Sequence, residues 1–178
     1  MYGTKEIETE RLLLRKIRLD DYKEIYKSWT SDEKVCKYVT WNKHKSSDET
    51  KELVKYWVNE YNSDYTYRWL VVEKDNYNVI GIIDVINKNI QYMTCEVGYC
   101  YGSKYWGMGY ATEALKAVIA YLHKEGFPVV YAEHFESNIA SGKVMKKAGM
   151  IYEATLRKRV INKEGKREDL LVYTSIKE

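Results

Sequence analysis

The sequence is short of the residues that interrupt regular structure. Its 178 residues include one proline and 10 glycines, so few positions demand special backbone angles. No run approaches the roughly 18 apolar residues of a membrane-spanning helix, and the N-terminus lacks the apolar segment of a signal peptide. With 45% hydrophobic and 31% charged residues, a disordered, collagen-like or disulfide-rich chain is excluded. We therefore expect a single domain covering residues 1–178.

Cysteine and net charge are also scarce. The three cysteines, Cys36, Cys95 and Cys100, are odd in number and lack the spacing of metal ligands. We therefore expect a reduced, cytoplasmic protein without a metal. Lys plus Arg at 29 against Asp plus Glu at 26 leaves a net charge of +3, which predicts neither a nucleic-acid nor a membrane partner. Composition leaves a monomer and a homodimer both open.

The hydrophobic pattern predicts a mixed α+β fold with a largely antiparallel sheet. Apolar residues recur with the period of a helix in four stretches, at about 22–29, 47–61, 111–122 and 138–148. Runs typical of β-strands, separated by polar turns, occupy 12–17, 67–73, 79–86, 92–101, 129–133, 151–161 and 167–176. About seven strands and about four helices are expected.

Four of the ten glycines lie close together, at Gly98, Gly102, Gly107 and Gly109. They accompany a turn that leads from a predicted strand into a predicted helix. Backbone N–H groups at a helix N-terminus have no intrahelical partner and bind phosphate well, and glycine lets an anion approach the backbone. For an isolated glycine pair, a tight turn without a ligand would be the better explanation, but the order of strand, turn and helix favours a phosphate site.

Two familiar nucleotide-binding motifs do not fit this turn. A Walker loop requires Gly-Lys-Ser or Gly-Lys-Thr, and neither tripeptide occurs in the chain. A dinucleotide-binding turn requires a third glycine where Thr112 stands, and it begins a parallel βαβ unit. A nicotinamide-dependent redox enzyme is therefore disfavoured.

The segment from Trp106 to Ala111, here called the glycine loop, resembles the pyrophosphate loop of the GNAT superfamily of N-acetyltransferases. That motif is written Gln/Arg-x-x-Gly-x-Gly/Ala, and the sequence departs from it at the first position, Trp106. The resemblance extends over residues 8–176 and is greatest to the ribosomal-protein-alanine N-acetyltransferase (RimJ/RimL-like) branch. Four further stretches agree in order: Thr9-Glu-Arg-Leu-Leu-Leu-Arg, Glu96-Val-Gly-Tyr, Asn138-Ile-Ala-Ser141 and Lys147-Ala-Gly149-Met.

This resemblance implies a GNAT-like acyl-CoA N-acyltransferase fold, with acetyl-CoA as co-substrate and a primary amine as acceptor. The strand at Tyr99 and Tyr101 would pair with the pantetheine arm as an added β-strand does, and a strand amide would face the thioester oxygen. Asn138 would cap a helix and contact the pantetheine. The diphosphate would bind the backbone of the whole glycine loop: Trp106, Gly107, Met108, Gly109, Tyr110 and Ala111.

Two residues are candidates for catalysis under this resemblance. Many relatives place a tyrosine where Met145 stands, so Ser141 would instead donate its hydroxyl toward the departing thiolate. An ordinary hydroxyl in the first turn of a helix is the alternative for Ser141. Glu96 would take the proton of the amine, directly or through a water. A strand glutamate paired with Lys or Arg is the alternative for Glu96.

The ordinary pKa values of amines bear on the acceptor. An α-amino group with a pKa of about 7.7 to 8.0 is roughly one-seventh neutral at pH 7, whereas a lysine near 10.4 is neutral about once in 2,500. A site with one candidate base therefore favours a protein N-terminus as acceptor. A small amine such as a polyamine or an amine antibiotic stays open, and so does a catalytically silent acyl-CoA-binding module, because Met145 replaces the tyrosine.

Overall fold

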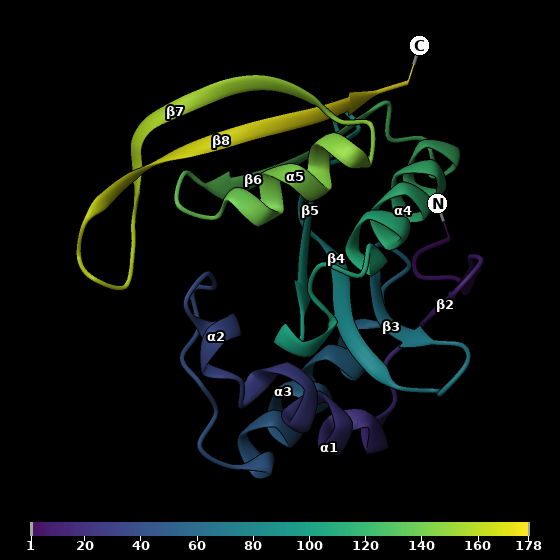
Figure 1. Cartoon of the computed structure of the whole chain (residues 1–178). Coiled ribbons are helices and arrows are strands. Elements are labelled where there is room, and N and C mark those ends of the chain that lie inside the picture. Colours follow the sequence, from purple (N-terminus) through teal and green to yellow (C-terminus); the bar gives the residue numbers. More distant parts are fainter. Residues whose placement is uncertain (1, 178) are drawn as a thin grey trace. The chain divides into compact units, whose positions relative to one another are not determined.

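The computed structural model describes residues 2–177 and contains an eight-stranded mixed sheet (Figure 1). Its strand order is β1-β2-β3-β4-β5-β6-β8-β7. The pair β5–β6 is parallel. The pairs β1–β2, β2–β3, β3–β4, β6–β8 and β7–β8 are antiparallel. The strands are β1 (Ile7–Glu8), β2 (Leu12–Arg15), β3 (Arg68–Glu73), β4 (Val79–Asn89), β5 (Thr94–Tyr101), β6 (Val129–Phe135), β7 (Ile151–Ile161) and β8 (Arg167–Ile176).

The helices complete the predicted α+β class, which is confirmed. They are α1 (Tyr22–Ile25), α2 (Glu33–Cys36), α3 (Ser47–Glu60), α4 (Tyr110–Glu125) and α5 (Ile139–Lys147). Short 3-10 turns cover Leu19–Asp21 and Ser103–Tyr105, and a π-helical turn covers Tyr26–Thr30. The sequence patterns missed β1 and α2, because elements of two and four residues are too short to show a hydrophobic period.

The described chain divides into two compact units. The first contains the residues up to Asp84 together with Tyr99–Ala114, and the second contains Val85–Gly98 together with the chain from Leu115 onward. The chain therefore passes from one unit to the other within β4, β5 and α4. That one domain covers residues 1–178 stays a prediction. Within residues 2–177, no helix is both long and apolar enough to cross a membrane.

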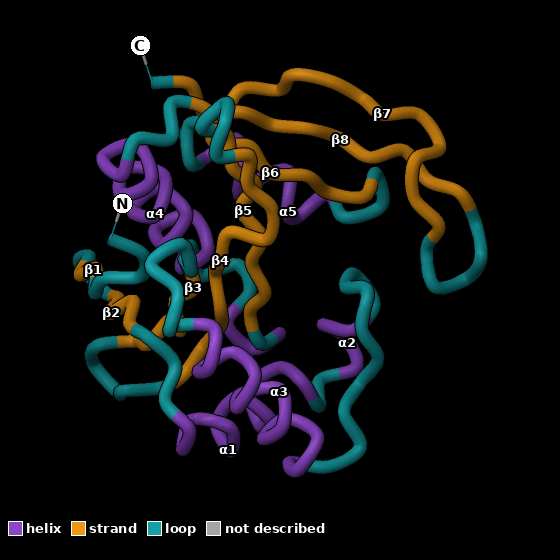
Figure 2. The backbone as a smooth tube through the Cα atoms, turned by 180° about the vertical axis from the view of Figure 1, so that it is seen from behind, coloured by secondary structure: helices purple, strands orange, loops and turns teal. Residues whose placement is uncertain are grey.

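In the first unit, the segments around α1 and α3 pack against β3 and β4 through apolar side chains. Trp29 and Val54 are almost completely buried, and Leu70 and Val72 alternate along β3 so that both reach the same core. Figure 2 shows α1 and α3 next to one another. The cluster consists of Ile17, Ile25, Trp29, Val35, Val54, Leu70, Val72, Val79 and Ile82.

In the second unit, β7 and β8 form a long curved hairpin (Figure 1), and α5 packs on one face of β6. Gly142 makes this packing possible, since a Cβ atom there would lie 2.6 Å from Nε2 of His134. The His134 ring stacks on Tyr173, with ring centroids 5.6 Å apart. The α5 side of β6 is thus the side on which His134 points.

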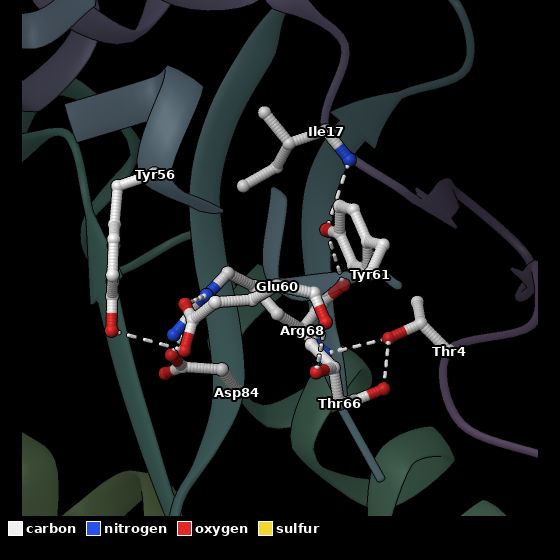
Figure 3. Close-up of polar contacts among 8 residues, drawn as sticks. All are labelled: Thr4, Ile17, Tyr56, Glu60, Tyr61, Thr66, Arg68 and Asp84. Carbon is white, nitrogen blue, oxygen red and sulfur yellow. Dashed lines mark hydrogen bonds and ion pairs between the residues drawn. The ribbon is translucent and has the colours of Figure 1, made fainter. Parts of the chain in front are cut away.

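An ion cluster that is largely shielded from solvent joins α3, β3 and β4 in the first unit. Figure 3 shows Arg68 between Glu60 and Asp84; its Nε lies 2.9 Å from Oδ2 of Asp84, and its Nη1 donates to Glu60. The Tyr61 hydroxyl donates to the Arg68 carbonyl at 2.9 Å. Burial raises the pKa of Asp84, although Arg68 favours its charged form.

Removal of this guanidinium leaves a buried carboxylate without its cation. Arg68→Met is expected to lower the free energy of unfolding by about 3 kcal/mol at pH 7. Because the folded-state pKa of Asp84 is raised, its contribution to stability is fully present below the unfolded pKa of about 3.9 and is lost as the pH rises through the folded value. Urea unfolding at pH 4 and pH 7 should therefore show the larger loss at pH 7.

Lys55→Met is the matched control, because Lys55 pairs with Glu52 on the exposed surface of α3. Lys55→Met should lower the free energy of unfolding by no more than about 0.5 kcal/mol. Equal losses from Arg68→Met and Lys55→Met would contradict the importance of the cluster.

Candidate active site

Both glycines of the glycine loop have left-handed backbone angles. After β5 and a 3-10 turn, Gly107 has φ +78° and Gly109 has φ +83°, which is the left-handed region that L side chains rarely adopt. Nothing lies within 4 Å of a Cβ atom built on Gly107. The side chains of Trp106 and Met108 are 45% and 53% exposed. The loop therefore presents its backbone beside the free N–H groups of the first turn of α4.

The end of β5 is tied to this loop. The indole Nε1 of Trp106 donates to the carbonyl oxygen of Tyr101 at 2.8 Å. The Tyr101 side chain is buried against Gly81, where a Cβ atom would lie 2.4 Å from Cδ1 of the ring. Burial raises the pKa of Tyr101 well above its ordinary value. Any contact of Tyr101 with a cofactor must therefore use its backbone, and Tyr99, whose ring lies 6.3 Å from that of Tyr101, is more accessible.

The first turn of α4 is anchored to the segment before β2. Oε1 of Glu113 accepts hydrogen bonds from Oγ1 of Thr9 at 2.6 Å and from the backbone N–H of Arg11 at 2.9 Å. Burial alone would raise the pKa of Glu113, but these hydrogen bonds outweigh it and the pKa is lowered. The Tyr110 hydroxyl donates to Glu73 at the end of β3. The loop and the helix start are thereby held by residues far away in the sequence.

Glu96 lies at the last paired position between β5 and β6. The parallel ladder runs from Thr94 opposite Val129 to Glu96 opposite Tyr131 and stops there, although both strands continue. The Tyr131 hydroxyl and the Asn87 side chain donate to the Glu96 carboxylate. Beyond Glu96, the backbone groups that face β6 are left without a strand partner in the second unit. Unpaired strand backbone of this kind can accept an extended, peptide-like ligand.

A second carboxylate lies beside Glu96. Glu133 follows Tyr131 by two residues on β6, so both side chains point to the same face of the sheet. Burial and then the Glu133 carboxylate raise the pKa of Glu96 to about 7, and the hydrogen bonds from Tyr131 and Asn87 partly oppose them. Burial also raises the pKa of Glu133, which Arg159 opposes. A carboxylate with a pKa near 7 can serve as a general base at neutral pH.

Asn138 and Ser141 occupy the start of α5. The Asn138 side-chain oxygen accepts from the Ser141 backbone N–H at 3.3 Å, which confirms the predicted helix cap. Ser141 is half-buried in the first turn, and Met145 is buried one turn further along. Because α5 packs on the His134 side of β6, Ser141 belongs to the opposite side of the sheet from Glu96.

The structure thus distributes the predicted site residues over two units. The first unit holds the glycine loop with Tyr99 and Tyr101; the second holds Glu96, Asn138 and Ser141. Within the second unit, Glu96 lies where the β5–β6 ladder ends, and Ser141 lies in the first turn of α5. Among residues 2–177, no three His, Cys, Asp or Glu side chains are grouped so as to hold a metal ion.

Sequence reasoning missed Tyr131 and Glu133. The spacing Tyr-x-Glu along a predicted strand indicates that the two side chains share one face of that strand. It does not indicate which strand lies beside it. The parallel register of β5 and β6 supplies that information. It brings both residues to Glu96.

Comparison with known proteins places this fold and loop in a class of acyltransferases. The sequence matches the family described as "Acetyltransferase (GNAT) domain" over residues 11–151. It is 34% identical over 153 residues to the uncharacterized N-acetyltransferase YnaD of Bacillus subtilis (strain 168), which covers 85% of this chain and 86% of YnaD. The chain belongs to the GNAT family of acetyltransferases, as the sequence resemblance predicts, and it is an enzyme of the acyltransferase class.

Solved structures agree with this assignment. A GNAT-family acetyltransferase from Bacillus anthracis has a TM-score of 0.84 at 27% identity, covering 97% of this chain and 98% of that protein. RimL, a ribosomal L7/L12 α-N-protein acetyltransferase solved in complex with coenzyme A, has a TM-score of 0.86 at 16% identity, covering 97% and 98%. At 16% identity the likeness to RimL concerns the fold.

The groups around Glu96 predict that two substitutions shift its pKa in opposite directions. Glu133→Gln removes a neighbouring negative charge and should lower the pKa of Glu96, whereas Tyr131→Phe removes a hydrogen bond to the carboxylate and should raise it. Carboxyl-carbon NMR of glutamate-labelled protein measures both midpoints against about 7 in the unaltered protein.

Glu164→Gln, in the exposed turn of the β7–β8 hairpin, is the control and should leave the midpoint of Glu96 in place. Shifts of the same sign in Glu133→Gln and Tyr131→Phe would indicate a general disturbance of the site, against the arrangement described.

Proposed function

We propose that this protein transfers an acetyl group from acetyl-CoA to a protein N-terminal α-amine, by direct attack of the amine on the thioester. The observation that carries the proposal is the position of Glu96, half-buried at the end of the β5–β6 ladder beside Glu133. Two carboxylates on one face attract an ammonium group, and the more buried environment of Glu96 suits it to accept the proton.

The free energy of proton transfer favours an α-amine over a lysine. An α-ammonium with a pKa of about 7.7 to 8.0 can transfer its proton to a base of pKa about 7 at a cost of about 1 kcal/mol. A lysine ammonium near 10.4 would cost about 4.6 kcal/mol. With Glu96 as the base, the more acidic amine is therefore the better acceptor.

The proposal also includes the residues that would bind the cofactor. The backbone from Trp106 to Ala111 would bind the diphosphate of acetyl-CoA, at left-handed glycines beside the start of α4. Tyr99 and Tyr101 would pair with the pantetheine through their backbone. The carbonyl of Tyr101 already accepts from Trp106, so it has one lone pair left for that pairing. Asn138 caps α5 and would lie near the same arm.

Ser141 would donate a hydrogen bond to the sulfur of the departing CoA thiolate. Met145, the position of the family's tyrosine, is buried and carries no proton donor. Within the second unit, Ser141 and Glu96 belong to opposite sides of the sheet, so acid and base would approach the thioester from opposite sides.

A small polyamine is the second candidate acceptor. A polyamine carries a second ammonium group, which would pair with Glu133 while the first is deprotonated at Glu96. A peptide whose second residue is neutral has no second ammonium group and would make no such pair with Glu133. A catalytically silent acyl-CoA-binding module is the candidate of another class. Cytoplasmic location and the choice between monomer and homodimer stay predictions.

A panel assay separates these candidates. Release of CoA thiol from acetyl-CoA is measured with N-terminal peptides, polyamines and amine antibiotics as acceptors. Turnover with peptides, blocked when their α-amine is formylated, is the expected result. Turnover with polyamines alone would show that a polyamine, and not a protein N-terminus, is the acceptor. Acetyl-CoA binding without turnover across the panel would support the silent module.

Substitution of the candidate acid and base should reduce turnover to different extents. Glu96→Gln removes the general base and should lower kcat by about 10². Ser141→Ala removes one hydrogen bond to a charged group, worth about 1.5 to 3 kcal/mol, so kcat should fall about 10- to 100-fold. Ser137→Ala, an exposed serine just before α5, is the control and should keep full activity. Full activity in Glu96→Gln or Ser141→Ala would remove that residue from the mechanism.

A further inference from the structure

The stretch Thr9-Glu-Arg-Leu-Leu-Leu-Arg agrees with the family pattern, but the proposed reaction assigns it no role. Arg11 is its third residue and lies in the short connection between β1 and β2. Its side chain is 42% exposed. Although 97 residues separate Arg11 from Met108 in the sequence, the Arg11 guanidinium lies on the glycine loop, within the first unit.

Three contacts fix the orientation of this guanidinium. Nε donates to Oε2 of Glu113 at 2.7 Å, and Nη1 donates to the carbonyl oxygen of Met108 at 3.0 Å. The central carbon lies 4.6 Å from the centre of the Tyr110 ring, within the range of a cation–π contact. A side chain held on three sides has little rotamer entropy left to lose when it binds a ligand.

The remaining nitrogen, Nη2, points to the place where the loop has no side chain. It lies 3.4 Å from the position that a Cβ atom of Gly109 would occupy. Among residues 2–177, Nη2 donates no hydrogen bond. Glu113 contacts the guanidinium through Nε alone, and its other carboxylate oxygen accepts from Thr9 and from the Arg11 backbone. The loop therefore carries an oriented, half-exposed cation with an unused donor.

The glycine loop supplies no cation of its own. Its six residues, Trp-Gly-Met-Gly-Tyr-Ala, contain no charged side chain, and Trp106 stands where the family motif has Gln or Arg. The indole of Trp106 is turned to the Tyr101 carbonyl instead. A dianionic diphosphate bound by backbone N–H groups alone would lack a charged partner in the loop.

We propose that Arg11 is a phosphate-binding residue of the acyl-CoA site and that its Nη2 donates to the diphosphate at the glycine loop. Glu113, with Thr9, positions Arg11 for this contact. The inference rests on the proposed use of acetyl-CoA. It assigns the cationic contact of the loop to a residue that precedes β2.

The test compares two acyl donors, acetyl-CoA and S-acetylpantetheine, which has the thioester but no phosphate. A charge-assisted hydrogen bond is worth about 1.5 to 3 kcal/mol, so Arg11→Gln should lower the ratio of kcat/KM for acetyl-CoA to that for S-acetylpantetheine about 10- to 100-fold. The affinity for CoA in calorimetry should fall by a similar factor. Arg11→Lys, which keeps the charge without the fork, should lie between Arg11→Gln and the unaltered protein.

Arg167→Gln is the control, since Arg167 is exposed on β8 and donates to the Lys158 carbonyl in the second unit; its donor ratio should equal that of the unaltered protein. A wild-type donor ratio in Arg11→Gln, or an equal loss with both donors, would overturn the role of Arg11. If Arg11→Gln does not fold, the donor ratio of Arg11→Lys decides by the same criterion. Failure of the unaltered protein to bind CoA would instead overturn the proposed function.

Discussion

The carboxylate of Glu113 is the interaction on which the cofactor side of this protein depends. It receives hydrogen bonds from Thr9, from the backbone of Arg11 and from the guanidinium of Arg11. These bonds attach the first turn of α4 to the segment before β2 and, with the contacts of Arg11 to Met108 and Tyr110, hold the guanidinium near Gly109. The left-handed glycines set the course of the backbone, and Glu113 holds that backbone in place.

The acceptor side depends on a different constraint, the early end of the β5–β6 ladder. Pairing stops at Glu96 and Tyr131 although both strands continue, so the last paired residue is also the candidate base. Glu133 adds a second negative charge on the same face, and burial strengthens its effect on Glu96. One local feature of the sheet thereby accounts both for the unpaired backbone and for the position of the candidate base.

Sequence patterns predicted the long elements and the loop well. The helix of α4, the hairpin of β7 and β8 and the cap at Asn138 follow from periodicity, turn residues and capping chemistry. The short β1 and α2 carried no periodic signal. Glu133 and Arg11 were missed for another reason: each acts on a residue of a distant segment, and local patterns do not give strand order or the path of a connection.

The central claim is that the glycine loop, with Arg11, binds the phosphate end of acetyl-CoA. Amide hydrogen exchange, read along the chain with and without acetyl-CoA, tests it most directly. The account predicts slower exchange in residues 106–113 with acetyl-CoA, and no such slowing with S-acetylpantetheine at equal occupancy. Unchanged exchange in this segment at saturating acetyl-CoA would contradict the account.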